Sequence, residues 1–215
     1  QGGETSLTLS LLAETVTIPA SASIVSEGPS LTLGDWQSAA VDVSGTITSG
    51  IIGSALTVRG PASISGNVQF YTMNFPNSLD LSGSLTGYEM ILGGAAIKLG
   101  GTISASKVSL SSLSILQDTG SLTANELLLS GDWWGIEQYA VSLNSSANQI
   151  GKIAFGNRFD SVNRFDSVTV KNTGSMEIVK YETTFEGGDE ISADSFVNKL
   201  DLRVVSGDLT VSVPL

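Results

Sequence analysis

A short unit of strand, glycine and renewed strand recurs along the chain. Residues 41–47 read VDVSGTI, residues 79–85 read LDLSGSL and residues 97–103 read IKLGGTI. Apolar and polar residues alternate within each unit, which is the period of a β-strand with one buried face. Glycine suits a corner between strands, because it adopts backbone angles that a Cβ obstructs. The recurrence predicts a fold built by repetition.

The spacing of these units matches single coils of a β-solenoid. Gly83, Gly101 and Gly120 lie 18 and 19 residues apart. Similar tripeptides begin at intervals of 24, 25 and 23 residues, at Leu7, Leu31, Leu56 and Leu79. Such a period accommodates two or three short strands per coil. We therefore predict an all-β right-handed parallel β-helix, or β-solenoid, over residues 1–215 as a single domain, with residues 181–215 forming more irregular, acidic terminal coils.

A second all-β architecture explains part of the pattern. A β-sandwich or jelly roll also has many short alternating strands, with turns about every 8–12 residues. It does not require strand and glycine units to recur at near-constant spacing. The solenoid is therefore the favoured prediction, and the sandwich or jelly roll is the alternative.

Composition excludes several classes of function. The chain has 10 basic and 21 acidic residues and a net charge of -11, which repels nucleic acids and acidic lipids. Cysteine and histidine are both absent, which removes disulfides, thiolate chemistry and imidazole bases, and we expect no cofactor. No apolar run reaches the roughly 20 residues that span a bilayer, so we expect no membrane insertion.

The repeated units resemble a known family of surface proteins. Together with ASISGN at 62–67 and KNTGSMEI at 171–178, they look like coils of filamentous-haemagglutinin-type exoproteins of two-partner secretion, and of autotransporter passenger domains. The NPNL and NPNG motifs of the secretion domain do not occur, so the resemblance concerns stalk-like coils. It implies a surface-exposed fibre that displays adhesive faces.

These observations predict a non-catalytic structural or adhesive rod. The acidic, cysteine-free, glycine-rich composition is typical of bacterial secreted proteins, so we expect an extracellular or cell-surface location. Residues 7–18 and 209–213 both alternate apolar with polar residues and offer no cap. Open strand edges recruit other chains, so we expect self-association head to tail into a filament, with a host or matrix glycan as a further partner.

The alternative function is a β-helix polysaccharide-binding protein or a polysaccharide-acting enzyme. Parallel β-helices also carry polysaccharide lyases and glycoside hydrolases, which use carboxylates on an outer face. The available acidic residues include Asp118, Asp132, Glu137, Asp160 and Asp166. Acidic side chains at turns mostly bond to nearby backbone amides, and none of these residues sits in a catalytic motif. We therefore predict no catalytic residues.

An aromatic cluster is the candidate glycan contact. Trp133, Trp134 and Tyr139 follow a glycine at an expected coil corner. Sugars stack on such rings, because the apolar face of a pyranose fits a flat indole. Adjacent residues of a strand point to opposite faces, so packing of part of this cluster in the core is the favoured interpretation.

An acidic stretch near the end of the chain is a weak calcium candidate. Glu186, Asp189 and Glu190 lie close to a pair of glycines, and calcium prefers carboxylate oxygens. The ligand spacing of an EF-hand and the calcium-binding nonapeptide repeat are both absent. We favour a solvated acidic loop and predict no metal site.

Overall fold

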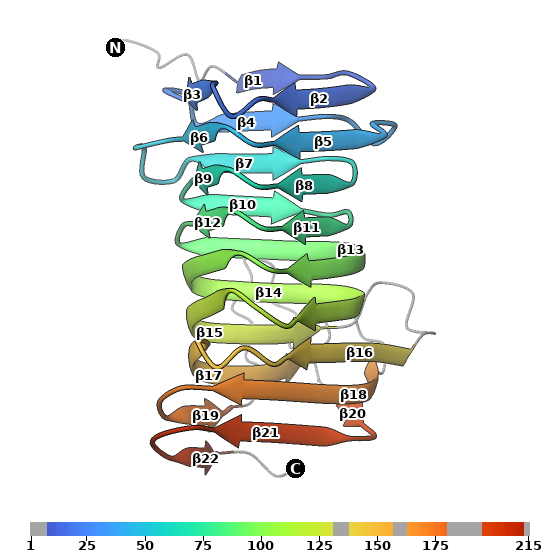
Figure 1. The fold of residues 1–215 in the computed structure, drawn as a ribbon, viewed down its shortest axis with the longest axis vertical. Coiled ribbons are helices and arrows are strands. Elements are labelled where there is room, and N and C mark those ends of the chain that lie inside the picture. Colours follow the sequence, from blue (N-terminus) through green and yellow to red (C-terminus); the bar gives the residue numbers. More distant parts are fainter. Residues whose placement is uncertain (1–7, 131–137, 157–162, 180–194, 213–215) are drawn as a thin grey trace, which may run out of the picture.

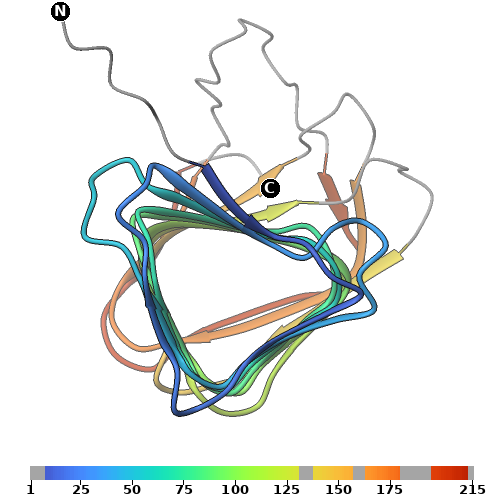
Figure 2. The ribbon, with the colours of Figure 1, turned by 90° about the horizontal axis from the view of Figure 1, so that it is seen from above.

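The computed structural model describes residues 8–130, 138–156, 163–179 and 195–212, and the structural statements below concern these ranges. All regular structure in them is β, and no helix occurs there. The 22 strands belong to one continuous sheet, which winds around a long axis (Figure 1). Seen from the N-terminal end, the chain turns clockwise as it recedes, so the solenoid is right-handed (Figure 2). The predicted parallel β-solenoid is confirmed.

Strand pairing excludes the β-sandwich alternative. Every pairing in the described residues is parallel, including those between neighbouring coils at the start and end of the chain. A sandwich or jelly roll is built from antiparallel pairs. The triangular cross-section in Figure 2 instead results from three stacks of parallel strands, referred to below as the first, second and third face.

The first face is the longest stack. It contains β1 (Thr8–Leu11), β4 (Ser30–Leu33), β7 (Ala55–Val58), β10 (Thr72–Phe75), parts of β13 (Glu89–Leu99), β14 (Thr102–Gln117), β15 (Ser121–Ser130) and β17 (Gln149–Gly156), then β19 (Met176–Ile178) and β22 (Leu209–Val211).

The second face follows each strand of the first. It contains β2 (Thr15–Ile18), β5 (Ala40–Val43), β8 (Ala62–Ile64), β11 (Leu79–Leu81), the ends of β13 and β14, β16 (Gln138–Leu143), β18 (Asn163–Asn172) and β21 (Leu200–Val204), with β20 (Ser195–Val197) on the start of β18.

The third face closes each coil. It contains β3 (Ser23–Val25), β6 (Thr46–Thr48), β9 (Asn67–Gln69), β12 (Ser84–Thr86) and the first residues of β14, β15 and β17.

The repeated sequence units stack as predicted. Asp42 of the first unit pairs with Ser63, Ser63 with Asp80 of the second unit, and Asp80 with Lys98 of the third. All four residues lie in one outward column of the second face. The units are therefore successive copies of the same part of a coil.

The tripeptide alignment is partly wrong. Leu31 pairs with Leu56 as expected, but the partner of Leu31 in the preceding coil is Leu9 rather than Leu7. Leu79 lies on the second face, where it pairs with Ala62. Coils differ in length because their corners do, so a fixed interval in the sequence drifts out of register.

Apolar side chains fill the interior in continuous columns. The inward column of the first face consists of Leu9, Leu31, Leu56, Met73, Met90, Val108, Leu127, Ile153, Ile178 and Val211. From Leu31 to Ile178, each of these side chains is at most 2% exposed. Complete burial of one such side chain stabilises the fold by about 1.5–3 kcal/mol.

Glycines form the corner between the second and third faces. A Cβ on Gly101 would lie 2.0 Å from the carbonyl oxygen of Gly83, and one on Gly120 would lie 1.9 Å from that of Gly101. Gly120 also has a φ of 71°, which favours glycine. The close approach of successive backbones explains why glycine recurs at this position.

Further along the same edge, buried amides take over from the glycines. Gln117 and Asn148 exchange two hydrogen bonds, of 2.9 and 2.8 Å, and both side chains are buried. Asn148 Oδ1 also accepts a hydrogen bond from the backbone N–H of Leu122. Asn172 bonds in turn to the N–H and carbonyl of Ile150. The polar corner is thus satisfied internally, as buried polar groups require.

Candidate functional site

The two ends of the rod expose inward-facing apolar side chains. Leu9 is 44% exposed and Val211 is 47% exposed, although both belong to the column that is buried everywhere between them. Leu200 and Leu209 are also exposed, whereas their partners in the preceding coil, Val168 and Met176, are buried. The last coil therefore presents an uncovered cross-section of the core.

Strand edges at the ends are open as well. Within the described ranges, β1, β2 and β3 pair only with strands of the following coil, and β21 and β22 pair only with strands of the preceding coil. An unpaired edge presents a row of backbone donors and acceptors to a further strand. Apolar surface and unpaired backbone thus coincide at each end.

The side of the first face carries alternating charges. Its outward column contains Glu89, Lys107, Glu126, Lys152 and Glu177 in successive coils, and we call these five residues the charge ladder. Lys107 Nζ lies 3.8 Å from Glu126 Oε2. Each exposed pair is worth little by itself, but a slip of two residues along a strand would place Glu89 opposite Ser109 and separate the opposite charges. The charge ladder therefore favours the correct register.

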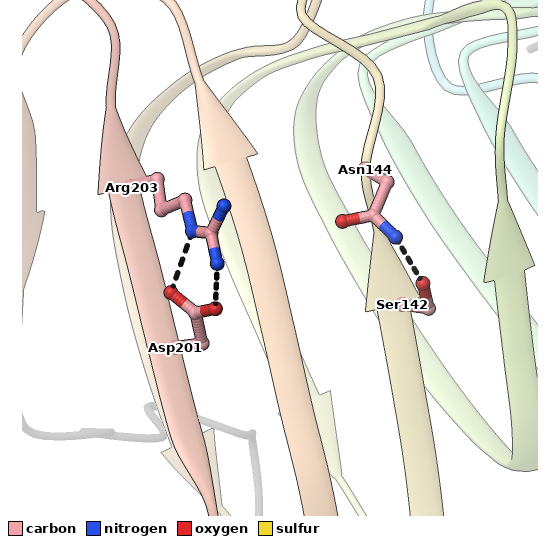
Figure 3. Close-up of polar contacts among 4 residues, drawn as sticks. All are labelled: Ser142, Asn144, Asp201 and Arg203. Carbon is pink, nitrogen blue, oxygen red and sulfur yellow. Dashed lines mark hydrogen bonds and ion pairs between the residues drawn. The ribbon is translucent and has the colours of Figure 1, made fainter.

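A second pair of charges lies near the end of the second face. Arg203 donates hydrogen bonds of 2.9 and 2.6 Å to the two carboxylate oxygens of Asp201 (Figure 3). These bonds, together with the positive charge of Arg203, lower the pKa of Asp201. The same bonds, together with the negative charge of Asp201, raise the pKa of Arg203. Asn144 likewise donates a 2.8 Å bond to Ser142. In each contact the two residues belong to the same strand or to its end, so these contacts order the surface without linking neighbouring coils.

An exposed tryptophan stands at the corner between the first and second faces. Trp36 is 67% exposed, and the guanidinium carbon of Arg59, one coil further on, lies 5.3 Å from the centre of its ring. A shallow groove begins beside this corner on the second face. Its floor and rim include Ala40, Asp42, Pro61, Ser63, Asp80 and Lys98.

Two tyrosines form a second exposed aromatic feature. Tyr71 and Tyr88 stack with ring centres 4.9 Å apart and an interplanar angle of 11°. They occupy equivalent places in adjacent coils, directly before the paired residues Thr72 and Glu89. Because each ring covers one face of the other, the pair leaves little flat surface for a ligand.

Of the three residues of the candidate glycan contact, the structure describes Tyr139. Tyr139 is buried and packs against Phe165, with ring centres 5.7 Å apart, so this side chain does not face solvent. It sits on an inward position of the core, which the alternation of the strand did not reveal. Trp133 and Trp134 lie outside the described residues.

The structure describes two of the acidic candidates, Asp118 and Asp166. Glu186, Asp189 and Glu190 lie outside the described residues, as do Asp132, Glu137 and Asp160. In the part of the chain that the structure describes, no three His, Cys, Asp or Glu side chains are grouped so that they could hold a metal ion. Asp118 and Asp166 are exposed on separate coils.

Sequence reasoning missed the contact between Trp36 and Arg59. The two residues are 23 positions apart, close to the 25-residue interval between paired residues of this coil, so only the correct coil length brings them together. A signal was nevertheless present, because Arg59 is the only Lys or Arg in residues 1–97. An isolated cation in an acidic segment indicates a specific partner.

No protein-family model, no curated protein and no solved structure matches this chain. In the described ranges, no helix has the length and apolar character needed to cross a membrane.

Proposed function

We propose that this chain is a non-catalytic structural rod that assembles head to tail into a fibre. One observation carries the proposal. The inward column of the first face is buried from Leu31 to Ile178 but is about half exposed at its two ends, Leu9 and Val211. A second copy placed on either end would continue the column and cover both residues.

The direction of the strands makes such stacking possible. All strands of one face run the same way, so the first coil of one copy can pair in parallel with the last coil of the next. The two contacting surfaces differ, and this heterologous, head-to-tail contact does not close on itself. Repetition of the contact produces an open filament.

Apolar burial supplies the driving force. Val211 and Leu209 lose their solvent exposure on stacking, as Leu9 does on the facing copy, and each removed square ångström contributes roughly 25 cal/mol. The unpaired edges gain backbone hydrogen bonds in the same step. A contact between two rigid coils also loses little conformational freedom, which favours association.

An extracellular site of action fits the composition. The chain lacks cysteine, is acidic and has 24 glycines among 215 residues. Its units resemble those of secreted fibre proteins, as noted above. We therefore place the proposed fibre outside the cell or on its surface, where a rigid acidic rod serves as a spacer.

Sedimentation velocity over a range of concentrations tests the proposal. We expect the natural chain to form larger species as its concentration rises. Val211→Lys puts a charge into the end surface and should abolish these species. Leu116→Lys is the matched control, because Leu116 is 42% exposed on the side of the rod, at an outward position. Equal association of both variants, or none by the natural chain, would contradict end-to-end stacking.

A further inference from the structure

The turn that carries Trp36 is fixed by hydrogen bonds. Asp35 Oδ1 accepts a 2.8 Å bond from the N–H of Gln37, and the N–H of Asp35 donates a 2.7 Å bond to Ser38 Oγ. Ser38 Oγ in turn donates to the carbonyl of Ala13 in the preceding coil. The turn is thus tied to the body of the rod, and the exposed Trp36 ring is held on a rigid base.

Arg59 lies over one face of this ring, in a cation–π contact that leaves the other face for a ligand, and it has no counterion. It follows β7 in the next coil, and none of the ion pairs in the described residues involves it. Its Nε atom is buried and has no hydrogen-bond partner. A guanidinium has five donors, and the half-buried Arg59 forms no side-chain hydrogen bond with the other described residues.

The surrounding charge makes this cation distinctive. Residues 1–97 contain seven acidic side chains and one basic side chain, Arg59. The other cations with described ion pairs are already neutralised, as Lys98 is by Asp80 and Arg203 is by Asp201. Arg59 is therefore an isolated positive point on an acidic surface, next to a flat aromatic ring.

We propose that Trp36 and Arg59 form a binding site for a carboxylated sugar, of the uronic or sialic acid type, within a glycan. The exposed indole offers a surface for the apolar face of a pyranose, and guanidinium binds carboxylate through charge-assisted, often bidentate hydrogen bonds. A sugar with one carboxylate matches the one guanidinium of this site. A densely charged polyanion is repelled by the net charge of -11.

The groove on the second face provides room for the rest of the glycan. It begins at Ala40, shortly after the turn, and at Pro61, two residues after Arg59. Small side chains line its floor, and Asp42 and Ser63 offer polar atoms to sugar hydroxyls. The site lies on the side of the rod, so it does not depend on end-to-end assembly.

Titration of the ¹⁵N-labelled chain with 3′-sialyllactose, and separately with lactose, tests the site. We expect the Trp36 indole signal, assigned with Trp36→Phe, to shift with 3′-sialyllactose alone. Arg59→Gln should weaken binding by about tenfold or more, since a charge-assisted hydrogen bond is lost. Arg203→Gln is the matched control and should leave binding unchanged, because that guanidinium is already paired.

Several outcomes would overturn the inference. Equal shifts with lactose would remove the role of the carboxylate, and unchanged affinity of Arg59→Gln would remove the role of the cation. Binding of a peptide with a free terminal carboxylate, without binding of 3′-sialyllactose, would indicate a peptide site instead. Circular dichroism of Arg59→Gln and Trp36→Phe separates loss of binding from loss of fold.

Discussion

Leu9 and Val211 occupy opposite ends of one inward column, and the two side chains are nearly equally exposed, at 44% and 47%. The eight residues between them in that column are buried. Within the described residues, this interior column thus runs continuously between two exposed apolar side chains. This relationship motivates the head-to-tail assembly and distinguishes the ends from the charged and hydroxyl-rich sides.

The glycine corner predicts a severe effect of one added methyl group. Gly101→Ala places a Cβ about 2.0 Å from the backbone oxygen of Gly83, which forces the coils apart. We expect a loss of about 3 kcal/mol or more in the free energy of unfolding, measured by urea denaturation. Gly50→Ala is the control, because a Cβ there meets nothing within 4 Å, and a similar loss in both variants would refute the explanation.

Removal of the buried amide at Asn148 should be costly. Asn148→Ala leaves the N–H of Leu122 and the side chain of Gln117 without their partners. Each buried unsatisfied group costs about 1–3 kcal/mol. We therefore expect the melting temperature of Asn148→Ala to lie well below that of the natural chain. Asn144→Ala removes one exposed bond, to Ser142, and should change stability by less than about 0.5 kcal/mol. Comparable melting of the two variants would argue against a structural role for the amide corner.

Reversal of one charge in the charge ladder should destabilise the rod modestly. Lys107→Glu places three carboxylates, those of residues 89, 107 and 126, in adjacent coils. We expect a loss of about 1 kcal/mol in low salt, which diminishes as added salt screens the repulsion. Lys107→Gln separates lost attraction from added repulsion and should have the smaller effect. A salt-independent loss would point to packing rather than charge.

The pair Asp201 and Arg203 predicts a specific pH dependence. Arg203 lowers the pKa of Asp201, chiefly through the side-chain hydrogen bonds. A carboxyl group with a lowered pKa stabilises the fold above its unfolded pKa of about 3.9, and this contribution is lost as pH falls through the folded value. An NMR titration of the Asp201 carboxyl should give a midpoint below that of Asp201 in Arg203→Gln. Identical midpoints would show that the pair is not formed in solution.

Much of the fold was predictable because glycine and strand alternation are local properties. The units at 41–47, 79–85 and 97–103 fall on the same part of successive coils. Exact register was not predictable, since Ala55 pairs with Thr72, 17 residues on, whereas Glu126 pairs with Lys152, 26 residues on. The differences lie in the lengths of the corners, which strand alternation and the recurring glycines do not specify.

The candidate site depended on those same corners. Packing of part of the aromatic cluster was the favoured interpretation, but strand alternation could be set in either of two phases, and the structure shows that Tyr139 is the residue that points inward. Trp36 and Arg59 approach each other only because the corner after β4 and the corner after β7 lie one above the other. Contacts between coils depend on the length of every corner before them, and so they require the structure.

Negative-stain electron microscopy of the purified chain over a concentration series tests the head-to-tail account most directly. The account predicts unbranched filaments of single-rod width that lengthen as the concentration rises and that Val211→Lys reduces to short rods. Isolated short rods of the natural chain at every concentration would contradict it.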